Sequence, residues 1–590
     1  MHPLTGPARA TTAERDRRWV NRLARASALL IAALGAAACA GNSANRAPNI
    51  GIVLDQEQSP TQFALRSMLL ANRQGVETGA SSHSDQVLRF YESRNFLAAW
   101  SGNAENDGIG RAVRAMLARA REQGLRAEDY KLSQDDLPPP PGLKAAEYEV
   151  ALTDALLRYS RDVRTGRVRP TDIYNDVLLP PPSFDAAADL AAAFDAHSVA
   201  SFLADLAPPH PEYRQLAQAL ARYRAIADEG GWPSLPGQNP IKLEGNNPRL
   251  NLLVRRLAFE DPILAAIATP SAADLRDAVK RFQTRNGLEG DGRVGGETLT
   301  ALDTPASSRV AQIVANMERW RWLPREFERR YIAVNVPDQS LAFVRDGSAA
   351  LTSKVIVGNP MSPTPITRSE IIAVVANPPW NIPGDIAARD LLPHLRKSAN
   401  YLATKHMVVT DGPPGDPYGR TINWKSVIPA EFPYAIQQLP GPTTALGALM
   451  LDSPNDFDVY LHDTPNKKRF ESDIREISNG CVRVQQIIPL ASLALTGDAA
   501  KGMGRLNQVI KSRETQRLAL DAPLPVYFLY WTALAGTDGT AGFRPDPYGR
   551  DAPLIAALAN GGDRAGTSET QIGMRPSAVP QQIGPEELSP

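Results

Sequence analysis

The period of the hydrophobic pattern changes near residue 330, and this change constrains the fold more than any other feature. Before it, apolar residues recur every three or four positions, as at Val113 and Leu117 or Leu152 and Leu156, which predicts helices. After it, segments such as YIAVNVP, LAFVRDG and KVIVGNP are rich in β-branched and aromatic residues and are separated by turn formers, which predicts strands. We therefore expect a multidomain α+β protein with its helices first and a mostly β domain last.

The 590 residues are enough for several folded units, and proline, glycine and polar stretches suggest the boundaries. The helical part divides into a larger domain and a small three-helix module, and a mixed, partly helical insert interrupts the strands. The expected segments are an export signal (1–45), a linker (46–80), a helical domain (81–244), the module (245–305), the mostly β domain (328–535, insert about 385–440), a C-terminal extension (536–558) and a disordered tail (559–590).

The first segment has the pattern of an export signal. Five arginines between Arg15 and Arg25 precede an apolar run from Ala26 to Ala38 that is shorter than the ~20 residues of a membrane-spanning helix. Three alanines stand before Cys39, so processing could leave a lipidated Cys39, cleavage could follow a nearby alanine, or the segment could remain as a signal anchor. Each alternative places the later residues in the periplasm or cell envelope, and two of them make the N-terminus a membrane tether.

Charge and metal-ligand content exclude several function classes. The chain has 64 Lys plus Arg and 64 Asp plus Glu, so its formal charge is zero and no overall field attracts nucleic acid. Two cysteines and seven scattered histidines are too few for a zinc cage or an iron–sulfur cluster. We expect no nucleic-acid partner, no metal and no cofactor.

The residues that can carry chemistry lie between Val459 and Gln486. His462 ends a predicted strand, and Cys481 follows a glycine that permits a tight turn. A thiol beside an imidazole can be held as thiolate and attack a carbonyl, while backbone N–H groups at the turn stabilise the resulting oxyanion. This pattern outlines an acyl-transfer site around Cys481 and His462, although a lone cysteine is more often a small buried hydrophobe and a lone histidine more often a surface or satisfied residue. The resemblance described below assigns Cys481 as nucleophile and His462 as base. The turn consists of Ser478, Asn479, Gly480 and Cys481.

Further side chains are candidates for the substrate pocket. Tyr460 shares a strand face with His462 through the two-residue period, and it either lines the pocket or packs beneath it. Arg483 could pair with a substrate carboxylate, although bracing the turn is favoured. Trp424 could contact substrate, although packing in a core or lid is favoured. Ser478 could hold the histidine or cap the turn, and neither role is preferred.

The spacing around the cysteine resembles the signature of the L,D-transpeptidases of the YkuD type. In that family a histidine is followed after 14 to 17 residues by Ser-x-Gly-Cys-(Val or Ile)-Arg, and here 15 residues separate His462 from Ser478. The stretches KVIVGNPMSPTP, ANPPWNIP, LPGPTTALG and FRPDPYGRD are similar to the large multidomain periplasmic branch. Two positions depart from the pattern: Asn479 stands where many members have His, and Thr444 where PGPxNALG has Asn.

Two upstream segments add to the resemblance. FQTRNGLEGDGRVGGETLTAL resembles a peptidoglycan-binding three-helix module, although Phe282, Leu288 and Val294 would serve a small core equally well. The helical segment from about 84 to 240 is similar to the scaffold domain found ahead of such catalytic domains, and the insert of the β domain could act as a lid.

The resemblance implies an enzyme that acylates Cys481 with the third residue of a peptidoglycan tetrapeptide stem. D-alanine leaves, and the acyl group passes to an amine of a neighbouring stem to form a 3→3 cross-link. The implied partners are stem peptides and glycan, and carbapenems are expected to acylate the thiol. Two alternatives remain: an L,D-carboxypeptidase that uses water as acceptor, and a non-catalytic cell-wall-binding scaffold, against which the intact His462 and Cys481 argue.

Overall fold

The computed structural model describes residues 59–73, 83–132, 139–237, 239–245 and 247–560. The predicted export signal with Cys39, and nearly all of the predicted tail, lie outside the described residues. Two compact units are present. The first contains the described residues up to Arg167 together with 181–217, and the second contains 168–180 and the described residues from Gln218 onward.

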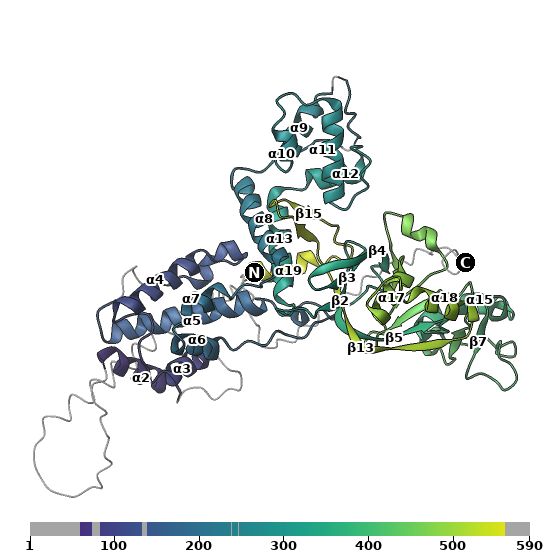
Figure 1. Cartoon of the computed structure of the whole chain (residues 1–590), viewed down its shortest axis with the longest axis horizontal. Coiled ribbons are helices and arrows are strands. Elements are labelled where there is room, and N and C mark those ends of the chain that lie inside the picture. Colours follow the sequence, from purple (N-terminus) through teal and green to yellow (C-terminus); the bar gives the residue numbers. More distant parts are fainter. Residues whose placement is uncertain (1–58, 74–82, 133–138, 238, 246, 561–590) are drawn as a thin grey trace, which may run out of the picture. The chain divides into compact units, whose positions relative to one another are not determined.

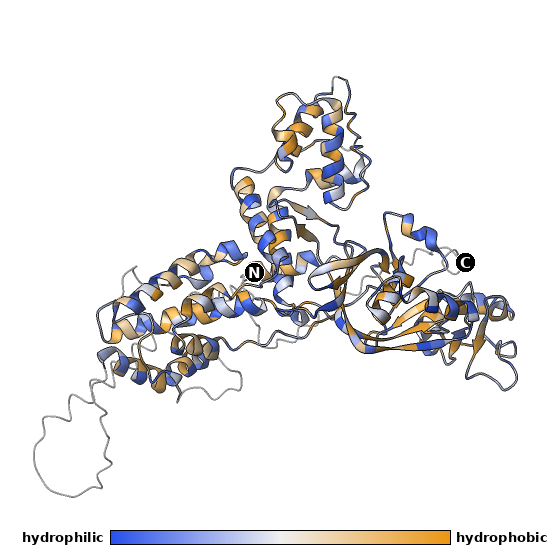
Figure 2. Cartoon of the chain, viewed as in Figure 1, coloured by the Kyte–Doolittle hydropathy of each residue, from blue (hydrophilic) through white to orange (hydrophobic). Residues whose placement is uncertain are grey.

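The first unit is a helical bundle built around its longest helix, α5 (Leu143–Thr165), which contacts α2, α3, α4 and α6 (Figure 1). Leu152, Leu156 and Val163 of the predicted stripe are buried in its core. Figure 2 shows apolar and hydrophilic positions side by side on these helices, as amphipathic packing requires. The other elements are α2 (Pro60–Arg73), α3 (His83–Ser93), α4 (Ala104–Ala118), η1 (Ala120–Gln123), η2 (Ala127–Tyr130), α6 (Ala186–Asp195), α7 (Val199–Ala204) and the start of α8 (Pro211–Asp228).

Helix α2 corrects the prediction of a linker over 46–80. Within that segment, residues 60–73 are helical, and Leu65, Met68 and Leu69 are buried in the core of the first unit. These residues follow one another after three positions and then one, which places them on one face of a helix. Polar residues around them obscured this pattern in the sequence. This part of the chain therefore belongs to the folded bundle.

A buried carboxylate ties the turn before α4 to α5. Glu149 is fully buried, and its carboxylate accepts hydrogen bonds from the backbone N–H groups of Ala99 (2.7 Å) and Trp100 (2.9 Å). It also accepts from the hydroxyls of Tyr91 (2.9 Å) and Ser101 (2.7 Å). Burial raises the pKa of Glu149, and these hydrogen bonds oppose that shift. One side chain thus satisfies four donors that lie far away in sequence.

The small module of the second unit has helices α9 (Arg249–Ala258), α10 (Pro262–Ala265), α11 (Ala272–Arg285) and α12 (Gly296–Asp303). Phe282 and Val294 are buried in its core, as the packing interpretation of the motif expects. Gln283 is buried too, and its Nε2 donates to Asp291 Oδ1 (2.8 Å) and to Thr298 Oγ1 (3.0 Å). These motif residues hold the loop between α11 and α12 in place.

The β domain is a ring of strands. The order of its sheet is β1-β5-β13-β2-β3-β4-β12-β10-β9, and an additional pairing of β5 with β9 closes the ring, while β11 pairs with β4. Inward residues such as Val334, Phe343 and Val357 fill its core. The strands are β1 (Val177–Leu178), β2 (Arg330–Asn335), β3 (Ser340–Arg345), β4 (Ser348–Gly358), β5 (Ile366–Ala376), β9 (Leu449–Asp452), β10 (Leu461–His462), β11 (Glu476–Ser478), β12 (Val482–Val484) and β13 (Gln516–Leu529).

Further helices and short strands accompany the ring. The helices are α13 (Ala306–Arg321), α17 (Ile487–Thr496) and α18 (Met503–Ser512), and the C-terminal part adds β14 (Ala533–Ala535), β15 (Ala541–Phe543) and α19 (Asp551–Ala559). Of these, α17 and α18 contact strands of the ring.

The mixed insert has its own sheet, ordered β6-β8-β7, and its own apolar core. Its elements are β6 (Trp380–Ile382), α14 (Gly384–Ile386), η4 (Ala387–Leu391), α15 (Leu392–Leu395), α16 (Tyr401–Thr404), β7 (Met407–Val409), η5 (Pro429–Glu431) and β8 (Ile436–Gln438). No helix in the described ranges is long and apolar enough to cross a membrane.

Replacing Glu149 by Gln should destabilise the first unit by about 2 kcal/mol or more, because an amide nitrogen would face donors that now meet an acceptor. Hydrogen exchange measured by mass spectrometry on the full chain should show faster exchange of the Ala99 and Trp100 amides. Glu147→Gln, a half-buried position on the same helix, is the matched control. Equal protection in the two variants would contradict the assigned role of Glu149.

Candidate active site

Two very short neighbouring strands bring the predicted nucleophile and base together. Strand β10 pairs in parallel with β12, with Leu461 opposite Val482 and His462 opposite Arg483. The N–H of Val482 donates to the carbonyl of Tyr460 at 2.9 Å. Leu461 and Val482 point into the core of the ring, so the alternating residues on both strands face the other way. Tyr460 and His462 therefore share a face with Cys481 and Arg483.

The turn before Cys481 has the backbone conformation that the sequence predicts. Gly480 has φ +104°, a region that side-chain-bearing residues rarely adopt. Ser478 Oγ donates to the carbonyl of Cys481 at 2.5 Å, so Ser478 closes the turn. Of the two roles left open for this serine, the hydrogen bond favours capping.

The imidazole of His462 is buried and held in one tautomer. Nδ1 lies 2.5 Å from the carbonyl oxygen of Asp463, and because a carbonyl only accepts, Nδ1 carries the proton and Nε2 is left unprotonated. Burial, assisted by the positive charge of Arg483, lowers the pKa of His462 to about 3. The ring is therefore neutral at physiological pH and can accept a proton at Nε2.

Cys481 is half-buried as a residue, and among the described residues it takes part in no disulfide. Its Sγ lies 3.7 Å from the carbonyl oxygen of Asp458, whereas His462 bonds Asp463, so neither hydrogen bond joins the two side chains. Burial raises the pKa of Cys481, while a hydrogen bond from the Tyr460 backbone and the charge of Arg483 oppose the shift. These shifts favour a neutral thiol and a neutral imidazole at rest over the thiolate that the sequence analysis considered.

The three predicted pocket residues have different surroundings. Tyr460 is half-buried on the site face, and its hydroxyl donates to Asp458 Oδ1 at 3.2 Å; burial and this carboxylate raise the pKa of Tyr460 to about 12. Arg483 is half-buried opposite His462. Trp424 lies elsewhere: it is 3% exposed in the core of the insert, and its Nε1 donates to the carbonyl of Gly419 at 2.8 Å. Trp424 is therefore no pocket residue, and of the two roles considered for it the structure has the favoured one, packing in the core of the insert.

The two departures from the family pattern have local partners. Asn479 Oδ1 accepts a hydrogen bond at 2.8 Å from Arg389 of the insert. Thr444 is buried, and its hydroxyl donates to the carbonyl of Leu439 at 2.8 Å, which fastens the loop after β8. Asn479 thus connects the cysteine turn to the insert.

Asp463 ties this loop to the strand of the histidine. Its Oδ2 accepts from the N–H of Ala448 at 2.9 Å, and its Oδ1 forms an ion pair with Lys467. A Cβ on Gly447, whose φ is +63°, would lie 2.5 Å from the Asp463 side chain. Only glycine permits this close approach, which holds Asp463 in place, and with it the backbone carbonyl that bonds the His462 ring.

Several residues at the site were missed by the sequence reasoning. The loop after β4 contacts the turn from behind: Asn359 Nδ2 donates to the carbonyl of Ser478 at 2.9 Å, and Thr364 Oγ1 donates to that of Gly480 at 2.7 Å. Both lie in the stretch KVIVGNPMSPTP, so the motif itself was the available signal. Arg389, in contrast, stands in no motif that would have indicated its contact.

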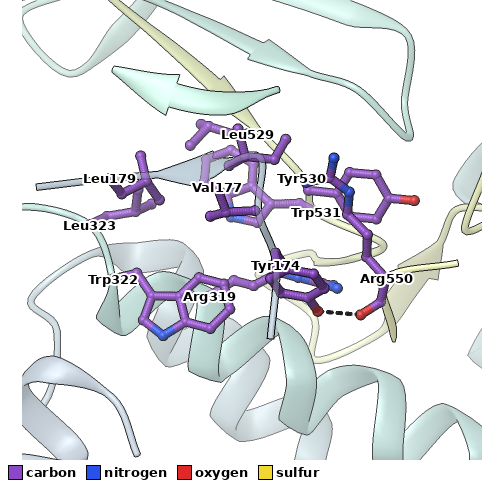
Figure 3. Close-up of a pocket in the computed structure, with 11 residues that line it drawn as sticks. Tyr174, Val177, Leu179, Arg319, Trp322, Leu323, Leu529, Tyr530, Trp531 and Arg550 are labelled. Atoms are coloured by element: carbon purple, nitrogen blue, oxygen red, sulfur yellow. Dashed lines mark hydrogen bonds between the residues drawn. The ribbon is translucent and has the colours of Figure 1, made fainter. Parts of the chain in front are cut away.

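A small cavity lies away from these residues, lined among others by Tyr174, Arg319, Trp322 and Tyr530 (Figure 3). Its volume of about 20 Å³ is room for about one water molecule. A peptide does not fit there, so this cavity is no alternative substrate site.

The matches to known families cover most of the described chain. Residues 85–220 match the Scaffold domain, 255–302 a peptidoglycan binding domain, and 329–509 the YkuD family, described as L,D-transpeptidase catalytic domain. The ring of strands with its cysteine turn is thus a YkuD-type domain. The chain carries this L,D-transpeptidase catalytic domain behind a scaffold domain and a peptidoglycan-binding domain.

A curated protein of Haemophilus influenzae, assigned by name to the L,D-transpeptidases, is 34% identical over 278 residues, which are 46% of this chain and 56% of that protein. The chain therefore spans little more than half the length of this relative. The solved structure of the Ldtfm–avibactam carbamoyl enzyme is 13% identical and covers 34% of this chain and 49% of that one, with a TM-score of 0.16, which is too low to support an argument.

Alkylation of Cys481 should reveal the neutral resting pair. Because burial raises the pKa of the thiol, the thiolate fraction should grow only at a pH above the usual thiol value of about 8.5. Peptide mass spectrometry after iodoacetamide treatment, from about pH 5 to about pH 10 with N-acetylcysteine as reference, measures this rate. A rate that stays level down to about pH 5 would show that a thiolate is already present and would contradict the prediction.

Proposed function

We propose that this protein is an L,D-transpeptidase that cross-links peptidoglycan stems through an acyl-enzyme on Cys481. The observation that carries the proposal is the placement of Cys481 and His462 on one face of two paired strands, inside a domain of the matching family. Peptidoglycan is the partner that both this domain and the peptidoglycan-binding domain favour. The cell envelope is the compartment where such a substrate occurs.

The neutral pair defines how the first step proceeds. In the proposed step Nε2 of His462 takes the thiol proton as Sγ of Cys481 attacks the carbonyl of the third stem residue. The new C–S bond moves the carbonyl electron pair onto oxygen. Collapse of this intermediate breaks the C–N bond, and His462 returns the proton to the departing D-alanine amine.

The second step reverses the roles. An amine of a neighbouring stem attacks the thioester and gives its proton to His462, and the C–S bond breaks as Sγ regains a proton. The energy of the original peptide bond is conserved in the thioester, so no nucleotide is consumed. Water in place of the amine would give the carboxypeptidase reaction with the same groups.

Arg483 contributes charge rather than proton transfer. Its guanidinium stands opposite His462, and it lowers the pKa of both His462 and Cys481. A positive charge here favours neutral imidazole before the reaction and stabilises negative charge on sulfur during it. We assign Arg483 to this electrostatic role, which differs both from bracing the turn and from pairing with a substrate carboxylate.

Incubation of the protein with purified disaccharide-tetrapeptide tests the function. We expect cross-linked dimers with release of D-alanine, detected by chromatography and mass spectrometry. Cys481→Ala should lower turnover at least about a thousandfold and His462→Gln about a hundredfold or more, because the nucleophile and the base act as one unit. Cys39→Ala, at the other cysteine of the sequence, is the control and should retain activity.

The products separate the alternatives. Tripeptide monomers alone would identify a carboxypeptidase, and no product would identify a non-catalytic cell-wall-binding protein. Cross-linking by Cys481→Ala at the rate of the unaltered protein would refute the site.

The contact between Asn479 and the insert predicts an effect on substrate binding. Arg389→Gln removes a charged donor that holds the insert at the cysteine turn, so KM for the stem peptide should rise about three- to tenfold while kcat stays within about twofold. Arg420→Gln, which removes another exposed arginine of the insert that donates to Asn400, is the matched control. Steady-state kinetics with equal effects in both variants would contradict a role for the Arg389 contact.

A further inference from the structure

We propose that Thr364, held in place by Tyr548 of the C-terminal extension, is a positioning residue that aims the Cys481 N–H at the developing oxyanion. This inference rests on the proposed function and adds residues from two segments far from the nucleophile in sequence. Neither side chain touches the substrate, and both act through the backbone of the cysteine turn.

Thr364 is fully buried behind the turn, and its hydroxyl has two defined partners. Oγ1 accepts a hydrogen bond from the N–H of Gly358 at 2.9 Å and donates to the carbonyl of Gly480 at 2.7 Å. The Gly358 N–H takes up one lone pair of Oγ1, so the single hydroxyl proton of Thr364 is available for the Gly480 carbonyl. The direction of the Gly480 carbonyl is therefore fixed by a short hydrogen bond in a dry environment.

The Gly480 carbonyl and the Cys481 N–H belong to one planar peptide group. In a trans peptide the C=O and N–H vectors point in opposite directions, so a hydrogen bond that fixes the oxygen also fixes the N–H. Within the described part of the chain, the Cys481 N–H makes none of the hydrogen bonds that join backbone groups. It is thus a free donor beside Sγ, on the side of the peptide turned away from Thr364.

A second set of hydrogen bonds secures Thr364 itself. Tyr548 OH donates to the carbonyl of Gly358 at 2.5 Å and accepts from the N–H of Thr364 at 3.2 Å, so it bridges the two ends of the loop 358–364. The N–H of Tyr548 donates to Tyr530 OH at 2.9 Å, and Tyr530 OH donates to Asp546 Oδ1 at 2.5 Å. The stretch FRPDPYGRD thereby contributes to the site without reaching it.

The loop bridged by Tyr548 is itself tightly packed. A Cβ on Gly358 would collide with the carbonyl oxygen of Ser362 and lie 2.6 Å from the nitrogen of Thr364, so only glycine permits this fold. Asn359 donates through both its N–H and its Nδ2 to the carbonyl of Ser478, each at 2.9 Å. The loop therefore grips the cysteine turn at both ends, at Ser478 and at Gly480.

Two reagents separate oxyanion positioning from other effects on the thiol. Acylation by the carbapenem meropenem forms a C–S bond while the carbonyl electron pair moves to oxygen, so it needs the N–H donor. Alkylation by iodoacetamide displaces iodide at a saturated carbon and develops no oxyanion. A residue that only maintains packing or exposes the sulfur would change both rates together.

The variants are Thr364→Val, Thr364→Ser and Tyr548→Phe in the full chain, with Thr367→Val as matched control, since its hydroxyl donates to the carbonyl of Leu178 away from the turn. Thr364→Val should slow meropenem acylation about 10- to 100-fold with alkylation within about twofold, because an oxyanion donor is misdirected and not removed. Thr364→Ser should restore most of the acylation rate. Tyr548→Phe should slow acylation about 3- to 10-fold, through loss of one supporting hydrogen bond.

Rates are followed by loss of β-lactam absorbance and by intact mass. Unchanged acylation in both Thr364→Val and Tyr548→Phe would overturn the inference and leave the proposed function standing, and so would a parallel fall of acylation and alkylation. If the unaltered protein forms no adduct at Cys481 while iodoacetamide does modify it, the proposed function fails, and the inference fails with it.

Discussion

The parallel pairing of β10 with β12 is the interaction on which the site depends. These strands are two and three residues long, yet their register decides which side chains meet, because a slip by one residue would turn every side chain to the opposite face. The apolar pair Leu461 and Val482 selects the register, since both side chains are completely buried in the core of the ring. Packing of two hydrophobic residues thereby places Cys481 and His462 on one surface.

Such short strands hold their positions because neighbours on both sides fix them. β10 pairs with β9 and β12 pairs with β4, so each is an inner strand of the ring. The closure between β5 and β9 removes a free edge beside the histidine strand. Asp463 and Gly447 then lock the histidine, and Thr364 and Asn359 lock the cysteine turn. The two halves of the site are thus supported by different loops.

Sequence reasoning pointed to Cys481 and His462 as the candidate reactive pair because their signal is local. A histidine at a strand end and a cysteine after a glycine turn can be recognised from 25 consecutive positions, 459–483. The change of period at residue 330 similarly predicted where the run of strands begins, and β2 starts at Arg330. The two-residue strand β1 (Val177–Leu178), which pairs with β5, was missed because it lies in the part of the sequence predicted to be helical. Helix α2 was missed because its apolar stripe is short and lies in a polar segment.

Other features depend on burial, which no local pattern contains. The sequence around Trp424 does not decide whether its aromatic ring faces a pocket or a core, because that depends on the residues that fold over the ring. The resting protonation states depend on the desolvation of Cys481 and His462 together, which requires the complete domain. Tyr548 lies 190 residues from Gly358, the group it bonds, so only the folded chain connects them.

The departures at Asn479 and Thr444 show how a family pattern is adapted locally. The hydroxyl of Thr444 donates a hydrogen bond to the carbonyl of Leu439. This local bond needs a single donor, so a side chain with one proton to donate is sufficient at this position. Asn479 is exposed and offers a carbonyl oxygen to Arg389, which also pairs with Asp390. An uncharged acceptor takes this bond at any pH, whereas a histidine would lose its acceptor when protonated and would then repel the guanidinium. The asparagine therefore makes the contact between turn and insert independent of the proton transfer proposed for Cys481 and His462.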